Sequence, residues 1–393
     1  MPTADEMSVN DRRSYLNQMK KRYVRAPRAE RGQLLTEMEQ VTGLHRKSLT
    51  RLMQASSLER QPRVKQRGRT YGQQVEQVIV RVWESRDYIC AERLTPGLLG
   101  MAQHLARFEP LGLTSQVQEQ LATISRATVA RILRKHRSER RRLPQKGAER
   151  ANAVTKGVPL GRIAWDIEEP GHFEVDLVYH SGETTGGLHG HTLQLLDVAT
   201  GWSERVAVLG RSQKAMEGGF EHILGRLPFP VKELHPDNGS EFFNAHLVRY
   251  WKDKVTGVQL SRSRPWHKND NRFVEHKNDT LVRQYLGDLR LETPEQIAAL
   301  NALYEDMWLY YNLFQPVLHL SEKRLVGDKV VRKWDAAQTP YERLLASGIL
   351  KSEQQAHLQQ LYEHTNPLQL RQALYRQLEA IWQSALASPT SAA

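Results

Sequence analysis

The chain has 393 residues and one cysteine, with 56 Lys and Arg against 44 Asp and Glu, for a net charge of +12. A chain of this length holds two or three domains and can bury a core without disulfides. A single cysteine excludes a disulfide framework and a thiolate zinc site, and it fits a reducing compartment. No apolar run approaches the roughly 18 residues of a membrane span, and the first ten residues lack the apolar core of a signal peptide. We therefore expect a cytoplasmic protein with no membrane partner.

The charge is unevenly distributed along the chain. Residues 1–150 carry 30 basic and 15 acidic residues, a net charge of +15, whereas residues 151–393 carry 26 and 29, a net charge of −3. A basic block on a near-neutral remainder indicates a polyanion-binding part joined to a part with another task. A solvated, solubilising surface is the alternative, and the pattern of the residues has to decide between them.

The first 60 residues contain a helix-turn-helix pattern. Leu34, Leu35 and Met38 recur at helical spacing, Thr42–Leu44 interrupts them, and a second helix is expected over His45–Met53. A helix, a turn with glycine and a basic helix are the parts of a DNA-binding helix-turn-helix, although any two-helix hairpin could look similar. The residues of this second helix expected to contact DNA are Arg46, Lys47 and Arg51.

Residues 71–136 indicate a second such module. An apolar helical stripe runs over Val75–Trp83, and further on a turn, a Ser125 N-cap and another helix are expected. In that helix Val129, Ile132 and Leu133 should face inward, and the outward residues expected to contact DNA are Arg126, Arg131 and Arg134. A basic linker over 137–164 follows, which either tracks phosphates or serves as a plain connector.

From residue 165 the pattern changes to alternating strands and helices. Three antiparallel strands joined by short turns are expected over 172–180, 192–196 and 202–209. After them the expected elements are a helix over 212–227, a strand over 231–234, a helix over 244–252, a strand over 258–260 and a helix carrying Glu275. This order predicts an α/β domain built on a mixed five-stranded sheet.

Three acids stand at positions of this domain that can converge. Asp176 lies in the middle of a strand, Asp237 follows the end of another strand, and Glu275 lies on a later helix. Carboxylates are the hard oxygen ligands that Mg²⁺ prefers. Three of them can hold two ions about 3.5–4 Å apart for in-line displacement at phosphorus. The sequence therefore predicts that these acids are both metal ligands and catalytic residues.

Residues from about 165 to 290 resemble the integrase core of DDE transposases, which share the RNase H-like fold with retroviral integrases. The motifs that carry the resemblance are Phe173–Asp176, Asp197–Trp202, His235–Phe242 and Ser263–Asn278. With its two helix-turn-helix modules, nearly the whole chain is similar to bacterial insertion-sequence transposases. The resemblance implies all-α helix-turn-helix modules over 1–60 and 71–136, an RNase H-like catalytic core over 165–313, and a small, mostly helical C-terminal region with a basic segment over 314–393.

The resemblance also implies roles for individual residues. Asp176 would bridge two Mg²⁺ ions, with Asp237 completing one site and Glu275 the other, and Mn²⁺ is expected to substitute. DNA contacts near the acids are expected from His267, Lys268, Asn271, Arg272 and Lys277. The chain departs from retroviral integrases in lacking their His/Cys zinc module. It also has Asp279 and Val282 where those integrases place lysines.

The function implied by the resemblance is DNA transposition. Such an enzyme cleaves the terminal inverted repeats of an element and joins them to target DNA, as a homo-multimer assembled on DNA and associated with the nucleoid. The sequence leaves open whether an accessory ATPase takes part. Two alternatives remain: an inactive or domesticated DNA-binding regulator, disfavoured by the intact acid set, and an RNase H-fold nuclease, which would not need two helix-turn-helix modules.

Overall fold

We describe a computed structural model of the chain, covering residues 8–58, 70–136, 160–161, 166–183, 186–236, 251, 257–263, 272–326 and 329–386. The chain divides into two compact units, Met1–Thr70 and Tyr71–Ala393. Each unit has its own core and is described by itself. Across these residues, every helix is too short or too polar to cross a membrane.

The first unit is a bundle of three helices, α1 (Val9–Arg25), α2 (Arg28–Thr42) and α3 (Arg46–Gln54). Gly43 ends α2 with a φ of 67°, a left-handed conformation that suits glycine. His45 caps α3 by accepting a hydrogen bond from the Lys47 amide at 3.2 Å. The predicted helices and turn are confirmed as secondary structure, whereas the sequence pattern did not identify α1. Its apolar residues share one buried cluster with α2 and α3, formed by Leu16, Met19, Leu34, Leu35, Met38, Leu49 and Met53.

The second unit begins with five helices, α4 (Gln73–Ser85), α5 (Ala91–Leu94), α6 (Leu98–Leu105), α7 (Ser115–Thr123) and α8 (Arg126–Lys135). The Ser125 hydroxyl accepts a hydrogen bond from the Thr128 amide, so the predicted N-cap of α8 is confirmed. The apolar residues predicted to face inward, Val129, Ile132 and Leu133, are all buried.

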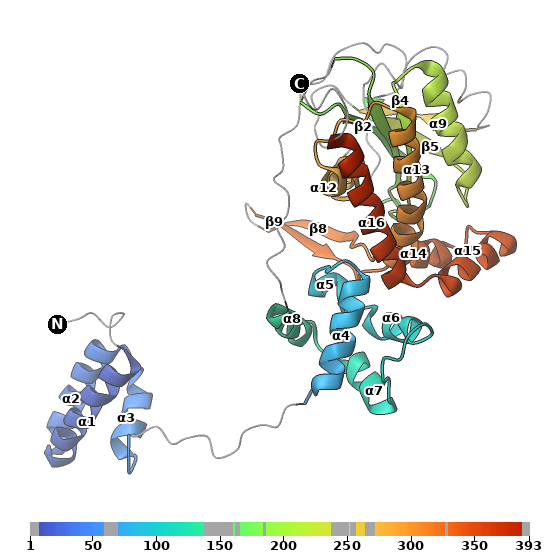
Figure 1. Ribbon diagram of the computed structural model, residues 1–393. Coiled ribbons are helices and arrows are strands. Elements are labelled where there is room, and N and C mark those ends of the chain that lie inside the picture. The colour runs from blue at the N-terminus through green and yellow to red at the C-terminus, as the bar shows by residue number, and fades with distance from the viewer. Residues whose placement is uncertain are drawn as a thin grey trace. The chain divides into compact units, whose positions relative to one another are not determined.

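A mixed five-stranded sheet forms the centre of the second unit (Figure 1). Its strands are β2 (His172–His180), β3 (Gly190–Asp197), β4 (Ser203–Leu209), β5 (Glu233–Pro236) and β6 (Gln259–Leu260). They lie in the order β4-β3-β2-β5-β6. The first three pair antiparallel, whereas β5 is parallel to both β2 and β6. The predicted sheet is confirmed, and with its flanking helices it fits an RNase H-like core.

Smaller elements complete this part of the chain. A short parallel pair joins β1 (Leu160–Gly161) to β7 (Arg262–Ser263). The predicted helix over 244–252 falls almost wholly outside the described residues. After the sheet come α11 (Arg272–Lys277), η1 (Asn278–Arg283), α12 (Gln284–Leu286), α13 (Pro294–Leu309), η2 (Tyr310–Phe314), β8 (Leu320–Val326), β9 (Lys329–Trp334), α14 (Pro340–Ser347), α15 (Ser352–His364) and α16 (Pro367–Leu386).

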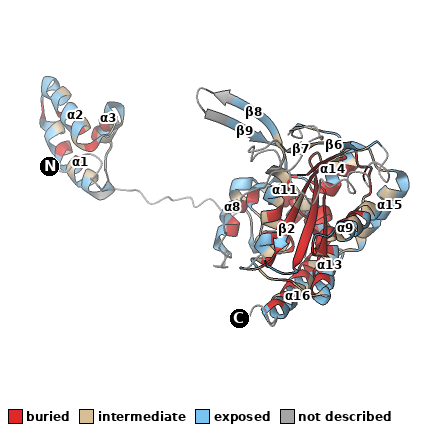
Figure 2. Cartoon of the chain, turned by 90° about the horizontal axis from the view of Figure 1, so that it is seen from above, coloured by how far each residue is buried: buried red, intermediate tan, exposed pale blue. Residues whose placement is uncertain are grey.

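The two faces of the sheet are covered by different helices. Leu193 and Val206 pair across the strands on one face, where α9 (Gln213–Arg226) approaches so closely that a Cβ at Gly219 would lie 3.2 Å from Val208. On the opposite face, Val178 and Ala207 share a buried cluster with residues of η1, α13 and α16. Figure 2 shows the central strand β2 buried between these layers. Asp176 lies on the second face, so α11 and η1 decide what surrounds it.

Two asparagine side chains close the free edge of the sheet at β4. Asn312 accepts a hydrogen bond from the Ser203 amide at 2.9 Å and donates to its carbonyl at 3.0 Å. Asn301 does the same at Ala207, with distances of 2.7 and 2.9 Å. Because an open strand edge can pair with other chains, these side chains act in place of a neighbouring strand.

A buried carboxylate joins β4 to α9 and α13. Glu204 is fully buried and accepts hydrogen bonds from the indole nitrogens of Trp202 and Trp308 at 2.8 and 2.7 Å. The Arg226 guanidinium contacts it at 2.7 Å. A buried charge is tolerated when its lone pairs are satisfied in this way.

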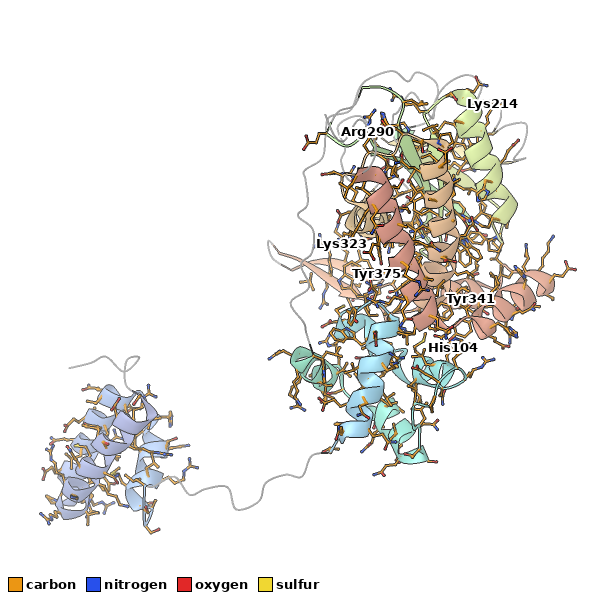
Figure 3. All side chains as sticks on the ribbon, in the orientation of Figure 1. His104, Lys214, Arg290, Lys323, Tyr341 and Tyr375 are labelled. Atoms are coloured by element: carbon orange, nitrogen blue, oxygen red, sulfur yellow. The ribbon has the colours of Figure 1, made fainter. Side chains whose placement is uncertain are left out.

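The second helical module packs directly against the C-terminal helices. Asp87 accepts hydrogen bonds from Arg371 at 2.8 Å and from Tyr375 at 2.9 Å, both on α16. His104 donates to the Thr365 carbonyl at 2.9 Å, and Figure 3 labels both His104 and Tyr375. These contacts join the segments predicted as 71–136 and 314–393, and together with 165–313 both belong to one compact unit.

We expect Asn312→Ala to lower the free energy of unfolding by about 3 kcal/mol, because it leaves the buried amide and carbonyl of Ser203 without partners. Urea denaturation followed by circular dichroism measures the change. Gln355→Ala, at an exposed position of α15, is the control and should shift stability by less than about 0.5 kcal/mol. Equal stability of the two variants would show that Asn312 does not protect the sheet edge.

Candidate active site

Asp176 lies in the middle of β2, half-buried, with both carboxylate oxygens in contact with the protein. Its Oδ1 accepts a hydrogen bond from the Leu177 amide at 2.8 Å. Its Oδ2 accepts one from the Asn278 side-chain amide at 2.5 Å. Asn278 is the first residue of η1, immediately after α11. This hydrogen bond therefore joins the central strand to the helix that carries Glu275.

Glu174 makes a second connection between the same two elements. It lies two residues before Asp176 on the same face of β2 and is 1% exposed. Its Oε2 accepts hydrogen bonds from the amides of Phe273 and Val274, each at 2.8 Å. Amides in the first turn of a helix have no intrahelical partner and carry partial positive charge. A buried carboxylate there satisfies both amides and fixes the start of α11 against β2.

Two of the three predicted acids lie on elements that contact each other, Asp176 on β2 and Glu275 on α11. Glu275 is exposed on α11, three positions before Asn278, so the two residues share a side of the helix. Because Asn278 contacts Asp176, the helix that carries Glu275 lies beside that acid. Asp237 lies outside the described residues. Pro236 pairs with Val175 in the parallel ladder, so β5 ends beside the residue that precedes Asp176.

A row of buried polar side chains continues from Asp176 across the sheet. Gln194 pairs with Asp176 across β2 and β3, and Arg205 pairs with Gln194 across β3 and β4. Both side chains are almost completely buried. Within the described part of the chain, the amide group of Gln194 and two guanidinium nitrogens of Arg205 have no hydrogen-bond partner. Leaving buried polar atoms of this kind unpaired costs free energy.

Lys277 is partly buried next to this row. Its ammonium lies 4.9 Å from the centre of the Tyr311 ring, and the Arg205 guanidinium lies 5.8 Å from the centre of the same ring. Burial, followed by the positive charges of Arg93 and Arg205, lowers the pKa of Lys277 to about 7. The predicted DNA-contacting lysine is thus in contact with an aromatic ring of η2.

The other residues expected to contact DNA form three sets, which lie on α3, on α8 and outside the described side chains. Arg46, Lys47 and Arg51 are exposed on α3, and Arg46 donates to the Gly32 carbonyl and the Thr36 hydroxyl, both at 2.9 Å. A second set is exposed on α8: Arg126, Arg131 and Arg134. A third set lies outside the described side chains: His267, Lys268, Asn271 and Arg272. Their contacts with DNA stay predictions.

The donor chemistry near Asp176 suits a hard divalent ion. Asp176 and Glu275 supply carboxylate oxygens, which Mg²⁺ prefers to nitrogen or sulfur. Within the described ranges, which omit Asp237, His, Cys, Asp and Glu side chains do not gather in threes close enough to hold a metal. A complete ligand set would need the third predicted acid.

Two residues that organise the site have no role predicted from the sequence. Glu174 shares a strand face with Asp176, and Asn278 lies in a motif, but neither contact with α11 or Asp176 is among the predictions. The spacing of these residues in the sequence could have indicated their role. Glu174 and Asp176 are two apart on a strand, and Glu275 and Asn278 are three apart on a helix, so each pair shares a side.

We expect Glu174→Ala to loosen the first turn of α11, because two amides lose their buried carboxylate acceptor. Hydrogen–deuterium exchange of peptides covering 272–277 should become at least about tenfold faster. This corresponds to a free energy of local opening that is lower by roughly 1.4 kcal/mol. Glu353→Ala, in the exposed first turn of α15, is the control and should leave that exchange unchanged. Unchanged exchange in Glu174→Ala would mean that the cap does not hold α11.

Comparison with known proteins places the chain among relatives. No protein-family model matches it. Among solved structures, the crystal structure of the catalytic core domain of BIV integrase aligns with 45% of this chain and 95% of its own, at 17% sequence identity and a TM-score of 0.30. A TM-score this low does not establish a common fold, so the fold class rests on the order and orientation of the strands.

One curated relative matches over most of both lengths. The "Uncharacterized protein y4rM" of Sinorhizobium fredii (strain NBRC 101917 / NGR234) is 34% identical over 341 residues. The match covers 86% of this chain and 97% of that protein. The chain therefore belongs to the same protein family as y4rM.

Proposed function

We propose that the protein is a DDE-type DNA transposase, which cleaves the ends of a DNA element and joins them to target DNA. The observation that supports this most directly is the hydrogen bond from Asn278 to Asp176, reinforced by the Glu174 cap. These contacts hold a strand acid next to the helix that carries Glu275.

In this proposal Asp176, Asp237 and Glu275 would hold two Mg²⁺ ions, or Mn²⁺, which supply Lewis acidity for displacement at phosphorus when bound. In cleavage, a water oxygen forms a bond to phosphorus as the bond to the 3′-oxygen breaks. In joining, that 3′-hydroxyl forms a bond to a target phosphorus as a target phosphodiester bond breaks. Asn278 would keep the Asp176 carboxylate in one orientation throughout.

DNA would be held by several parts of the chain. We propose that α2 and α3, and likewise α7 and α8, act as helix-turn-helix modules that bind the element's terminal inverted repeats. Lys277 and the basic residues around 267–272 would contact DNA beside the acids. Two ends react in one event, so we propose a homo-multimer assembled on DNA, with or without an accessory ATPase.

We expect Asp176→Asn, Asp237→Asn and Glu275→Gln each to lower joining by at least about 1,000-fold, since each removes a catalytic ligand. The assay uses purified protein, Mg²⁺, and a donor plasmid carrying the DNA that flanks the reading frame. DNA binding, measured by mobility shift in EDTA, should stay within about twofold. Near-normal joining by any of the three would contradict its assignment.

The matched control is Glu168→Gln, which removes an exposed carboxylate from the same unit and should leave joining unchanged. Wild-type protein that shifts the donor DNA but never joins it would instead support the DNA-binding regulator. Cleavage confined to RNA strands or junctions would support the nuclease.

We expect Asn278→Ala to lower the joining rate about 10- to 100-fold, the usual effect of removing a residue that orients a metal ligand. The Mg²⁺ concentration for half-maximal rate should rise, while DNA affinity stays unchanged. Gln284→Ala, exposed on the adjoining α12, is the control. A normal Mg²⁺ dependence in Asn278→Ala would show that Asn278 does not position Asp176.

A further inference from the structure

A two-stranded ribbon, formed by β8 and β9, projects from the second unit (Figures 1 and 2). Its cross-strand pairs include Glu322 with Lys333, Lys323 with Arg332, and Arg324 with Val331. The side chains of residues 321–324 and 331–334 are all exposed. An isolated two-stranded hairpin is marginally stable in water. A ribbon that buries so little of itself adds little to the core and presents its side chains to a partner.

The base of the ribbon is fixed to the body of the unit. Asp335, which follows β9, accepts a hydrogen bond from the His319 amide at 2.8 Å. Its other carboxylate oxygen contacts Arg343 of α14 at 2.8 Å. Arg343 also donates to the Val317 carbonyl at 3.1 Å. These contacts set the direction in which the ribbon leaves the body.

The two faces of the ribbon differ in charge. Because side chains alternate along a strand, Lys323, Arg332 and Trp334 share one face, which we call the basic face. The other face carries Arg324 and Lys333 together with Glu322, whose carboxylate lies 3.8 Å from Arg324. On the basic face, neither Lys323 nor Arg332 contacts an acid among the described side chains. Like charges directly opposite one another disfavour strand pairing.

We propose that the basic face of the ribbon binds the sugar–phosphate backbone of duplex DNA. The segment 320–334 contains five basic and two acidic residues, which matches a polyanion. A phosphate between Lys323 and Arg332 would remove their mutual repulsion, and a two-stranded ribbon is narrow enough to enter the major groove. Trp334, 52% exposed, adds an aromatic surface for a sugar or base.

The position of the ribbon agrees with this partner. In both Figures 1 and 2 it leaves the unit on the side where α8 lies, with the exposed arginines Arg126, Arg131 and Arg134. One duplex could therefore contact the ribbon and α8 together. The choice of DNA rests on the proposed function, because a transposase must hold duplex DNA beyond its reacting ends.

The test measures binding of the full-length protein to a 30-base-pair mixed-sequence duplex by fluorescence anisotropy, in EDTA and over a series of salt concentrations. Lys323→Gln combined with Arg332→Gln should weaken binding at least about tenfold at 0.1 M salt. The slope of log affinity against log salt should fall by about 2, one for each phosphate that is no longer neutralised. Trp334→Ala should weaken binding without changing the slope, because it removes no charge.

Two control variants remove the same charge elsewhere. Arg324→Gln with Lys333→Gln alters the opposite face of the same ribbon. Lys214→Gln with Arg376→Gln alters exposed residues of α9 and α16, and Lys214 lies far from Lys323 in Figure 3. Both controls should bind within about threefold of wild type. Equal losses in the two ribbon variants would overturn the assignment to the basic face, and an unchanged slope in the basic-face variant would overturn the proposal.

Two further measurements serve as controls. The first tests whether weaker binding is caused by unfolding, and the second tests whether the partner is duplex DNA or an acidic protein. The thermal midpoint of the basic-face variant should equal or exceed that of wild type, since a like-charge pair is removed, so weaker binding cannot reflect unfolding. The same variant is also tested for binding to a poly-glutamate peptide. If it no longer bound this peptide but still bound the duplex with wild-type affinity, the partner would be an acidic protein and the proposal would be overturned. Binding in EDTA also separates the ribbon from catalysis: the slope change should persist in Asp176→Asn, even if wild-type protein joins no DNA.

Discussion

The carboxylate of Glu174 is the contact on which the arrangement around Asp176 depends. It is buried and bound to the two amides that open α11, where the helix dipole favours a negative group. Desolvating such a group is costly, and the hydrogen bonds offset the cost. One turn later Asn278 repeats the connection at Asp176 itself. The strand and the helix that carry two of the predicted acids are therefore held as one body, and a shift of either would move both.

The rest of the second unit supports that body. Asn301 and Asn312 close the sheet at β4, and Glu204 joins the same strand to helices on both of its sides. Asp87 then ties the helices of 71–136 to α16. The exposed arginines of α8 thus belong to the same compact unit as Asp176, whereas those of α3 belong to a separate unit with its own core. DNA bound by α8 would be held in a set geometry relative to the acids.

Local patterns in the sequence predicted the elements well. Alternation marked β2, β3 and β4, and a hydroxyl cap with inward apolar residues marked α8, because these signals act within a few residues of one another. The contacts that organise the site were not predictable in this way. Glu174 and Asn278 each bond to a partner about 100 residues away, and nothing near them in the chain specifies that partner.

The sequence by itself determined the basic and near-neutral parts, the order of strands and helices, and the acids that fit a metal-dependent reaction. The tertiary structure decided which of these residues meet. It placed Lys277 against Tyr311, although a lysine in a polar motif suggests an exposed side chain. It also distributed the basic side chains of the ribbon over two faces that differ in charge. The physical reason is the same in each case: periodicity and capping are local, whereas burial, charge pairing and strand register arise only when distant segments pack.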